Sequence, residues 1–174
     1  MERDQWDEFD TVREEVFAGL RFGKYIDRSN PICQFLILPA FENPVSWDIV
    51  RINSRRAEAQ TRLYRSYWRM DFDYRAITSP VERMKYPRPF KPSIEVDWTL
   101  VEPTRVDALV AQLQSVRVPL AVAQPHMGCD GVTYEISFGG FFCHARIGWW
   151  CDLPEEWREL QPVIEEFNAL SELI

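Results

Sequence analysis

The side chains best suited to bind a metal ion gather in the last third of the chain. They are His126, Cys129, Cys143, His144 and Cys151. Tetrahedral zinc needs ligands that converge at about 2.0 to 2.3 Å, and structural sites use paired Cys or His at short, fixed spacings. The spacing here matches none of the usual patterns, and alternation along a strand would separate Cys143 from His144. We therefore expect a buried thiol and a surface histidine, with no bound metal and no cofactor.

An acid and an imidazole offer a second chemistry within residues 130–150. This segment alternates apolar and polar side chains on both sides of Gly139 and Gly140, which predicts a β-hairpin with a two-residue turn. That turn places Glu135 opposite His144, where a carboxylate beside an imidazole could act as a general base. Because no nucleophile accompanies them and such cross-strand pairs are common surface contacts, we expect no enzymatic activity. If the protein were an enzyme, Glu135 and His144 would be its catalytic residues.

The predicted hairpin has two faces. Its apolar face, which we expect to pack in the core, carries Val132, Tyr134, Ile136, Phe138, Phe141, Cys143, Ala145 and Ile147. On the opposite face Glu135, His144 and Arg146 would point outward, with Trp150 farther along the second strand. Cys143 would face inward and could not serve as a nucleophile.

Two pairs of carboxylates offer a third possibility, a cation site or a hydrolytic site. The pairs are Asp71 with Asp73 and Glu95 with Asp97. Residues two apart share one face of a strand, where two carboxylates could bind a cation. Solvated strand edges carry such acids routinely, and neither pair has a third carboxylate or a histidine beside it. We therefore expect no hydrolytic site at these positions.

Arginine and aromatic side chains are interleaved in residues 55–75, a composition that single-stranded nucleic-acid-binding proteins use for phosphate contact and base stacking. They are Arg55, Arg56, Arg62, Tyr64, Arg65, Tyr67, Trp68 and Arg69. The sequence pI near 4.9 opposes binding to a polyanion, and acidic segments elsewhere could neutralise these arginines within the fold. A module that binds a ligand or nucleic acid through this segment is therefore an alternative, and we expect nucleic acid not to be the main partner.

Hydrophobic periodicity predicts three helices that would frame these residues. Apolar side chains at helical spacing mark residues 4–21, residues 104–116 and the C-terminal stretch that contains Trp157 and Leu170. Asp4 and Thr104 are the expected caps of the first two helices, and Gly23 is expected to end the first. A proline inside a helix removes a hydrogen bond, so Pro162 should kink the third helix or divide it in two.

Four further segments, residues 32–38, 45–52, 61–74 and 93–100, are predicted as strands. Residues 32–38 form a nearly unbroken apolar run, which predicts a central strand buried on both faces. Residues 54–70 fit a helix or a strand, and we favour a strand over 61–74 because of its aromatic content. Alternation in 93–100 predicts an inward row of Ile94, Val96, Trp98 and Leu100.

These elements predict a single α+β domain that spans residues 1–174. We expect a mainly antiparallel sheet with an N-terminal helix, one helix near 104–116 and a C-terminal helix packed on it. A chain of 174 residues with 46% apolar composition can bury a core without disulfides or structural metals. No apolar run approaches the roughly 18 to 20 residues that cross a bilayer, and the N-terminus lacks a secretory pattern. We therefore expect no membrane contact, a cytoplasmic location and four reduced cysteines.

Charge is unevenly distributed around the net value of −7. Residues 1–20 carry seven acids against Arg3 and Arg13, and residues 152–174 carry seven acids against Arg158 alone. Residues 51–91 carry eleven basic residues against four acids. The chain therefore joins two acidic ends to a basic middle, and its acidic ends suit a basic protein partner.

A pattern near the C-terminus resembles one found in a known group of proteins. It runs Asp130-Gly131-x-x-Tyr134-Glu135, then Trp149-Trp150, then Pro154-x-x-Trp157-x-x-Leu160. This pattern is similar to one in small, uncharacterised bacterial proteins of accessory or immunity type, and it covers the last quarter of the chain. The resemblance implies an interaction protein rather than an enzyme, and it transfers no functional residue.

We therefore expect a non-enzymatic bacterial interaction protein, most concretely an immunity protein whose acidic surface blocks a cognate toxin, with a basic toxin domain as the partner. The expected partner-binding residues are Glu155, Glu156, Glu159, Trp150, Trp157 and Arg146, with Trp6 as a further aromatic anchor. The alternatives are a small enzyme that uses Glu135 and His144, or the binding module of residues 55–75. The oligomeric state and the identity of the toxin stay open.

Overall fold

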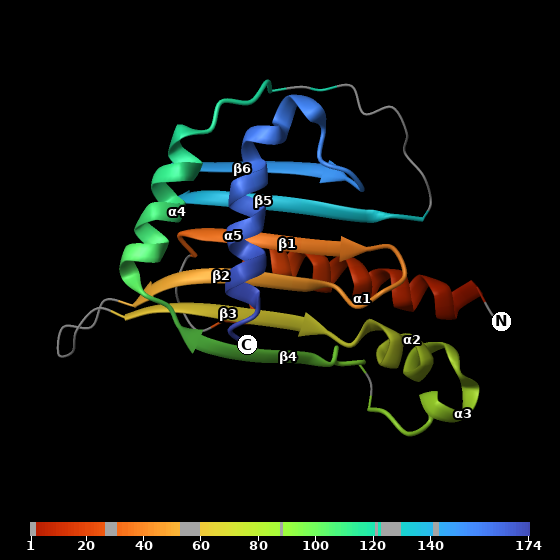
Figure 1. Cartoon of the computed structure of the whole chain (residues 1–174). Helices are drawn as coiled ribbons and strands as arrows, with labels where there is room; N and C mark the ends of the chain where they lie inside the picture. The colour runs from red at the N-terminus through yellow and green to blue at the C-terminus, as the bar shows by residue number, and fades with distance from the viewer. Residues whose placement is uncertain are drawn as a thin grey trace.

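A computed structural model describes residues 3–26, 31–52, 60–87, 89–120, 122, 130–140 and 143–174. Its centre is a six-stranded sheet in which every neighbouring pair of strands is antiparallel (Figure 1). The strands are β1 (Cys33–Pro39), β2 (Val45–Ile52), β3 (Gln60–Trp68), β4 (Ile94–Leu100), β5 (Val132–Gly140) and β6 (Cys143–Trp150). They lie in the order β4-β3-β2-β1-β5-β6, so β4 and β6 are the two edges.

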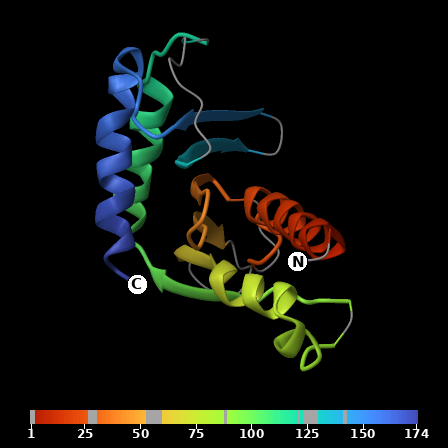
Figure 2. The ribbon, with the colours of Figure 1, turned by 90° about the vertical axis from the view of Figure 1, so that its right-hand side faces the viewer.

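Helices cover both faces of the sheet and give three layers (Figure 2). α1 (Arg3–Arg21) lies across one face, with α2 (Met70–Thr78) beside it and the short α3 (Pro80–Arg83) after it. α4 (Pro103–Ser115), the 3-10 helix η1 (Glu155–Leu160) and α5 (Gln161–Ser171) lie on the other face. This arrangement confirms the predicted α+β fold, including the C-terminal helix packed on the helix near 104–116.

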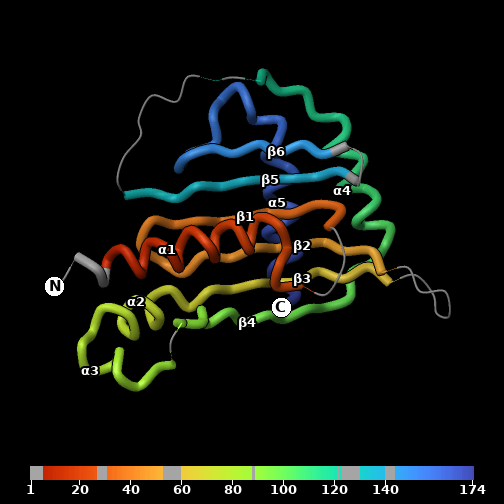
Figure 3. The backbone as a smooth tube through the Cα atoms, turned by 180° about the vertical axis from the view of Figure 1, so that it is seen from behind, coloured from red at the N-terminus to blue at the C-terminus, as the bar shows by residue number. Residues whose placement is uncertain are grey.

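Each face of the sheet has its own hydrophobic core, because strand side chains alternate between the faces. The core under α4 and α5 includes Phe35, Trp47, Ile49, Leu63, Ile136 and Trp149 from the strands and Leu109, Val163 and Phe167 from the helices. The core under α1 includes Leu36, Leu38 and Trp68 from the strands and Phe9, Val16, Leu20, Met70 and Ile77 from the helices. β1 contributes to both cores, as predicted for a central strand. Seen from behind, α1 lies over β1 and β2 (Figure 3).

Two of the predicted helix ends follow from local signals. α1 ends at Arg21, and Gly23 follows with a φ of 60°, a left-handed conformation that glycine adopts without strain. Pro162 occupies the first turn of α5, directly after η1. The C-terminal helical stretch therefore consists of two pieces, as predicted, because proline is tolerated in a first turn but not in a helix interior.

The two predicted helix caps are wrong. Asp4 lies inside α1, so it does not precede the helix. Glu102 rather than Thr104 precedes α4, which starts on a proline, and no side chain caps that helix. Asp107 in the first half of α4 forms an ion pair with Arg51 of β2 at 2.5 Å. This contact ties α4 to the sheet.

The chain after β3 differs from the strand predicted over 61–74. β3 ends at Trp68 and the helix α2 begins at Met70. The buried positions of α2 recur at helical spacing against α1, and they are Met70, Asp73, Ala76 and Ile77. Asp71 and Asp73 therefore lie in the first turn of a helix, where carboxylates are favourable beside the helix dipole. They do not share a strand face, which removes the cation site considered for this pair.

The β5–β6 hairpin has a different register from the predicted one. β5 continues to Gly140 and β6 begins at Cys143, so the turn does not centre on Gly139 and Gly140. Each β5 residue pairs four positions farther along β6 than predicted, and this even displacement leaves the two faces unchanged. The observed register pairs Tyr134 with Trp149, whose rings stack at 5.5 Å. This aromatic pair favours the observed register over the predicted one.

β4 alternates as predicted, but its apolar side chains do not point into the protein. Val96, Trp98 and Leu100 are 39%, 50% and 57% exposed. They lie on the α1 side of the sheet, where α1 spans β1 and β2 and leaves the β4 edge uncovered. The expectation of an inward row is therefore wrong for these three residues, because they lie beyond the strands that α1 spans.

Candidate partner-binding site

The predicted cross-strand pair of Glu135 with His144, which would be catalytic only if the protein were an enzyme, does not form. Glu135 lies opposite Gly148, and His144 lies opposite Gly139. The two residues are thus four positions apart along the hairpin, or about 13 Å at the usual rise of a strand. His144 is exposed, as predicted, but it has no carboxylate across the strand.

Glu135 is instead held by two arginines beneath the end of α1. Arg21 donates from Nε to both carboxylate oxygens, at 2.9 and 3.0 Å, and from Nη2 at 2.5 Å. Arg146 Nε lies 3.8 Å from the same carboxylate. Glu135 is 8% exposed, so the expectation that it points outward is wrong. Two guanidinium groups neutralise a carboxylate that burial alone would disfavour, which makes this a structural contact.

Arg146 and Trp150, two of the expected partner-binding residues, join the hairpin to its surroundings on the α1 side. Arg146 is exposed and donates from Nη2 to the Arg21 carbonyl oxygen at 3.3 Å. Its guanidinium also lies over the Phe22 ring, 5.5 Å from the centroid. Trp150 is half-buried and packs against Gly131 so closely that a Cβ at that glycine would collide with the indole. Both residues therefore stabilise the fold where they also reach the surface.

The acidic residues expected to bind a partner lie on η1, on the opposite side of the sheet from Arg146 and Trp150. All three are exposed: Glu155, Glu156 and Glu159. Glu155 pairs with Arg158 at 3.0 Å, and Glu159 accepts the Arg117 backbone N–H at 2.9 Å. Trp157 is 8% exposed, and its Nε1 donates to the Pro119 carbonyl oxygen at 3.0 Å. The structure therefore places Trp157 in the core and does not bring the expected partner-binding residues together.

Strand alternation also divides the arginine and aromatic segment of residues 55–75. Within β3, Arg62, Tyr64 and the fully buried Trp68 face α1, whereas Arg65 and Tyr67 face the opposite way. Arg55 and Arg56 lie outside the described residues. The carboxylate pair of β4 takes up two of these arginines, since Asp97 pairs with Arg65 at 2.5 Å and Glu95 with Arg69 at 3.6 Å. No single arginine and aromatic face results in the described part of the segment.

No metal centre is present among the described side chains, where no group of three or more His, Cys, Asp or Glu could hold an ion. Cys33 and Cys151 are free thiols, the first buried and the second exposed. Burial, with a smaller contribution from the Asp48 charge, raises the pKa of Cys33 to about 12. His126, Cys129 and the side chain of Cys143 lie outside the described part of the structure. Within the described residues, no helix has the length and apolar character needed to cross a membrane.

A buried polar cluster lies between the sheet and the end of α1. Gln34 Nε2 donates to Asp48 Oδ1 at 2.6 Å and to the Leu20 carbonyl oxygen at 2.8 Å, and it lies 3.0 Å from Ser46 Oγ. Ser46 Oγ donates to Asp48 Oδ2 at 2.6 Å. Burial raises the pKa of Asp48 to about 6, although both hydrogen bonds oppose the shift. The cluster is enclosed, so its role is to satisfy the end of α1 rather than to meet a ligand.

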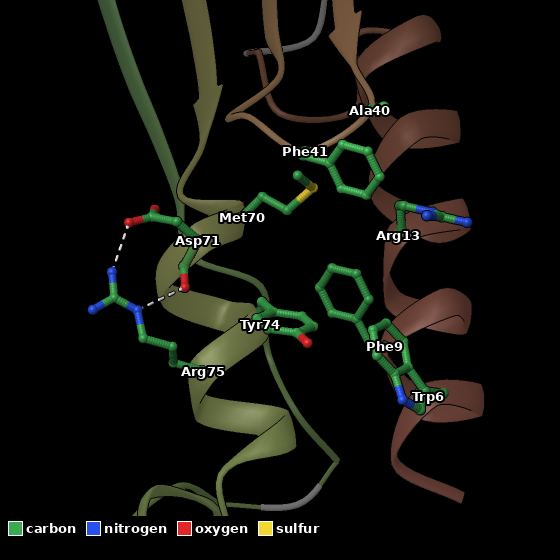
Figure 4. Close-up of a pocket in the computed structure, with 9 residues that line it drawn as sticks. All are labelled: Trp6, Phe9, Arg13, Ala40, Phe41, Met70, Asp71, Tyr74 and Arg75. Atoms are coloured by element: carbon green, nitrogen blue, oxygen red, sulfur yellow. Dashed lines mark hydrogen bonds and ion pairs between the residues drawn. The ribbon is translucent and has the colours of Figure 1, made fainter. Parts of the chain in front are cut away.

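An open cavity lined by several aromatic side chains lies between α1, α2 and the connection from β1 to β2 (Figure 4). Its volume is about 520 Å³, and it is lined by Trp6, Phe9, Arg13, Ala40, Phe41, Met70, Asp71, Tyr74 and Arg75. The Trp6 and Tyr74 rings lie 5.6 Å apart, and Phe9 meets Tyr74 edge-on at 5.1 Å. Trp6 is 40% exposed and Phe41 is 74% exposed. We call this site the aromatic pocket.

The charged groups at the rim of the aromatic pocket are already paired. Arg75 Nη2 lies 3.0 Å from Asp71, and Arg13 Nη2 lies 3.1 Å from Asp10. The walls are apolar, and no nucleophile or histidine lines them. The pocket can therefore accept an apolar or aromatic group but offers no acid-base chemistry of its own. Helical spacing identified Trp6 as a possible anchor, whereas Phe41 and Tyr74 come from two other segments and gave no such signal.

Comparison with known proteins identifies no relative. The chain matches no protein family, and neither a curated protein nor a solved structure shows significant similarity to it.

Proposed function

We propose that this protein is a non-enzymatic interaction protein of the bacterial cytoplasm that binds a basic protein partner. The observation that carries this proposal is the open aromatic pocket beside the acidic surface of α1. The exposed rings of Trp6 and Phe41, backed by Tyr74, suit one apolar or aromatic side chain of a partner. Buried aromatic anchors of this kind supply most of the affinity in protein interfaces.

Acidic side chains flank the pocket on α1 and would attract a basic partner. Asp7 and Glu14 are exposed, and Asp10 is half-buried beside Arg13. Clustered carboxylates raise the rate of association with a positively charged surface, and this effect weakens as salt increases. The pocket and α1 together therefore combine an affinity anchor with electrostatic attraction.

The most concrete form of the proposal is an immunity protein that blocks a cognate toxin. Its support is the acidic ends of the chain and the resemblance of residues 130–160 to small bacterial proteins of immunity type. A nuclease toxin presents a basic surface, because its substrate is a polyanion. An acidic protein bound over that surface would prevent access of the nucleic acid.

Two acidic surfaces are available, and the pocket favours the one on α1. The η1 acids Glu155 and Glu159 have partners within the chain, whereas the aromatic pocket lies on the α1 side of the sheet. Glu156 is exposed on the same short helix. We therefore place the partner on the α1 side and treat η1 as the competing surface.

The test uses the product of the neighbouring gene as the candidate toxin. Co-expression with this chain should restore growth, and Trp6→Ala and Phe41→Ala should each raise the dissociation constant by about 10- to 100-fold, as loss of an anchor does. Leu120→Ala is the matched control, because Leu120 is fully exposed and lies away from the pocket. Weaker binding by Glu156→Lys with normal binding by Trp6→Ala would move the interface to η1. Loss of protection by His144→Ala with intact binding would instead favour an enzyme.

A second candidate function rests on the volume of the same pocket. Small-molecule sites commonly enclose about 300 to 1,000 Å³, and the aromatic pocket falls within this range. A small apolar ligand would compete with the partner for Trp6 and Phe41, and it would raise the thermal midpoint of the isolated protein. The alternatives based on Glu135 with His144, or on the arginines of residues 55–75, lack a comparable assembled site within the described residues.

A further inference from the structure

β4 presents an open strand edge. At the two ends of the β3–β4 ladder, Val101 N–H donates to the Thr61 carbonyl oxygen and Arg69 N–H to the Ser93 carbonyl oxygen, each at 3.0 Å. Odd-numbered residues of β4 therefore bond to β3, and the N–H and C=O groups of the even-numbered residues point away from it. In the described part of the chain no strand pairs with this side of β4. A row of backbone donors and acceptors is thus available to another strand.

Several features by which edge strands avoid pairing are missing from β4, and its two charged residues, Glu95 and Asp97, are paired with arginines of β3. Its sequence, Ile94 to Leu100, contains no proline and no lysine, and its pairing with β3 continues without a bulge. Val96, Trp98 and Leu100 form an exposed apolar row on the α1 side of the strand. An apolar, regular and uncovered edge strand is a typical surface for association by strand pairing.

We infer that two copies of this chain pair through β4 in antiparallel orientation, about a two-fold axis that passes beside Trp98. The joined sheets would form one continuous sheet with the α1 layers of both copies on the same side. An interface of this kind is isologous, because both copies contribute the same strand to it. The pairing does not involve the aromatic pocket, so this inference is independent of the proposed function.

The charges of β4 select the register. Antiparallel registers centred on any residue from Val96 to Thr99 keep the outward-pointing backbone groups paired, and the one centred on Val96 would place Glu95 opposite Asp97 of the second copy. The register centred on Asp97 would place the Asp97 carboxylates of the two copies directly opposite each other. Their side chains would be close together at this non-hydrogen-bonded pair, which is unfavourable for like charges. The register centred on Trp98 places Asp97 opposite Thr99 of the second copy and Val96 opposite Leu100. It pairs the two indole rings with each other and every other exposed apolar residue with an apolar one.

The same charges favour a second copy over a charged peptide as the occupant. Asp97 and Glu95 are already paired with Arg65 and Arg69 of β3, so the edge has little net charge with which to attract a basic strand. Arg62 lies over the Trp98 ring at 4.0 Å from its centroid and holds the indole against the sheet. The other side of this half-exposed ring remains available to its counterpart. The match between partners is therefore apolar and self-complementary.

The oligomeric state of the full chain tests the inference. Sedimentation equilibrium should give a mass that approaches twice 20.6 kDa as the concentration rises. Trp98→Lys should remain monomeric where the wild type is dimeric, whereas Leu120→Lys, with the same charge change at a fully exposed site, should dimerise normally. Because Trp98 is half-exposed, circular dichroism should show that the lysine variant is folded. A monomeric wild type, or an unchanged dimer in Trp98→Lys, would overturn the inference.

Cysteine cross-linking tests the register separately. Residues of a hydrogen-bonded antiparallel pair have Cα atoms about 5.5 Å apart, within the range that a disulfide spans. In a Cys151→Ser background, Trp98→Cys should therefore give a covalent dimer joined at position 98 on mild oxidation, as identified by peptide mapping. Asp97→Cys should cross-link far less, because Asp97 of one copy lies opposite Thr99 of the other copy rather than opposite Asp97. Preferential cross-linking of Asp97→Cys would show that the proposed register is wrong.

Discussion

Replacement of Asp48 by Asn should stabilise the protein at neutral pH, because the native structure holds this carboxylate away from water. Asp48 is 1% exposed, and among the described residues its carboxylate accepts hydrogen bonds from the Gln34 amide and the Ser46 hydroxyl, neither of which carries a charge. Burial raises its pKa from 3.8 to about 6. The folded state therefore binds a proton at pH values where the unfolded chain has already released it.

The magnitude follows from this difference in pKa. At about 1.4 kcal/mol per unit, the shift of Asp48 corresponds to about 3 kcal/mol. Because the folded pKa is raised, this contribution is fully present below the unfolded value of 3.8 and is lost as pH rises through about 6. Asn does not titrate, so the variant escapes the loss. The N–H₂ group of the new amide would face Ser46. An imperfect hydrogen bond there would lower the free energy of unfolding of the variant by about 1 kcal/mol.

Urea unfolding of the wild type and of Asp48→Asn, monitored by the fluorescence of the seven tryptophans, measures the effect. The free energy of unfolding of the variant, relative to wild type, should rise by about 3 kcal/mol between about pH 4 and pH 7, with the net gain at pH 7 near 2 kcal/mol. Glu156→Gln is the control, because Glu156 is exposed and its replacement should give no such slope. A difference between Asp48→Asn and wild type that stays constant across this range would refute the assignment of a raised pKa to burial.

Three further outcomes are expected. Gly131→Ala should lower the free energy of unfolding by about 1 to 3 kcal/mol in urea titrations, because the added Cβ would collide with the half-buried Trp150 indole; an unchanged midpoint would contradict this close contact. Iodoacetamide labelling followed by mass spectrometry should modify the exposed Cys151 in the native protein but spare the buried Cys33, whose pKa is near 12, until urea is added; rapid native labelling of Cys33 would be inconsistent with its burial. Phe167→Ala should cost about 3 to 5 kcal/mol in the same titrations, and a loss below 1 kcal/mol would mean that the core beneath α5 is not packed as described.

Much of the fold follows from local patterns in the sequence. The apolar run of β1, the alternation of β4 and the hairpin strands, and the helical stripes of α1, α4 and α5 each identify an element from its own residues. Gly23 and Pro162 mark a helix end and a helix division, because their backbone conformations are restricted in known ways. These features depend on residues that are adjacent in the chain, so they can be predicted from the sequence.

The hairpin shows where this local information ends. Period-two alternation determines which residues share a face, but any even displacement of one strand leaves those faces unchanged. The tertiary structure selects the register that stacks Tyr134 on Trp149, and this choice separates Glu135 from His144. The proposed acid and imidazole pair was therefore wrong, although its assignment to one face was right.

The candidate site was predictable only in part. Trp6 stands out on an amphipathic helix, but the aromatic pocket also needs Phe41 and Tyr74 from segments distant in the sequence. Likewise, alternation identified the apolar row of β4, including Trp98, but not its exposure.

The sequence by itself determined most of the elements, with α2 as the exception, together with their two-sided character and the acidic ends of the chain. Only the tertiary structure decided which faces are covered, because coverage depends on where helices cross the sheet. α1 spans β1 and β2, so it buries Asp48 and Glu135 while it leaves Trp98 exposed. Burial, pairing and exposure are set by contacts between distant segments, and these contacts determine which side chains are available to bind a partner.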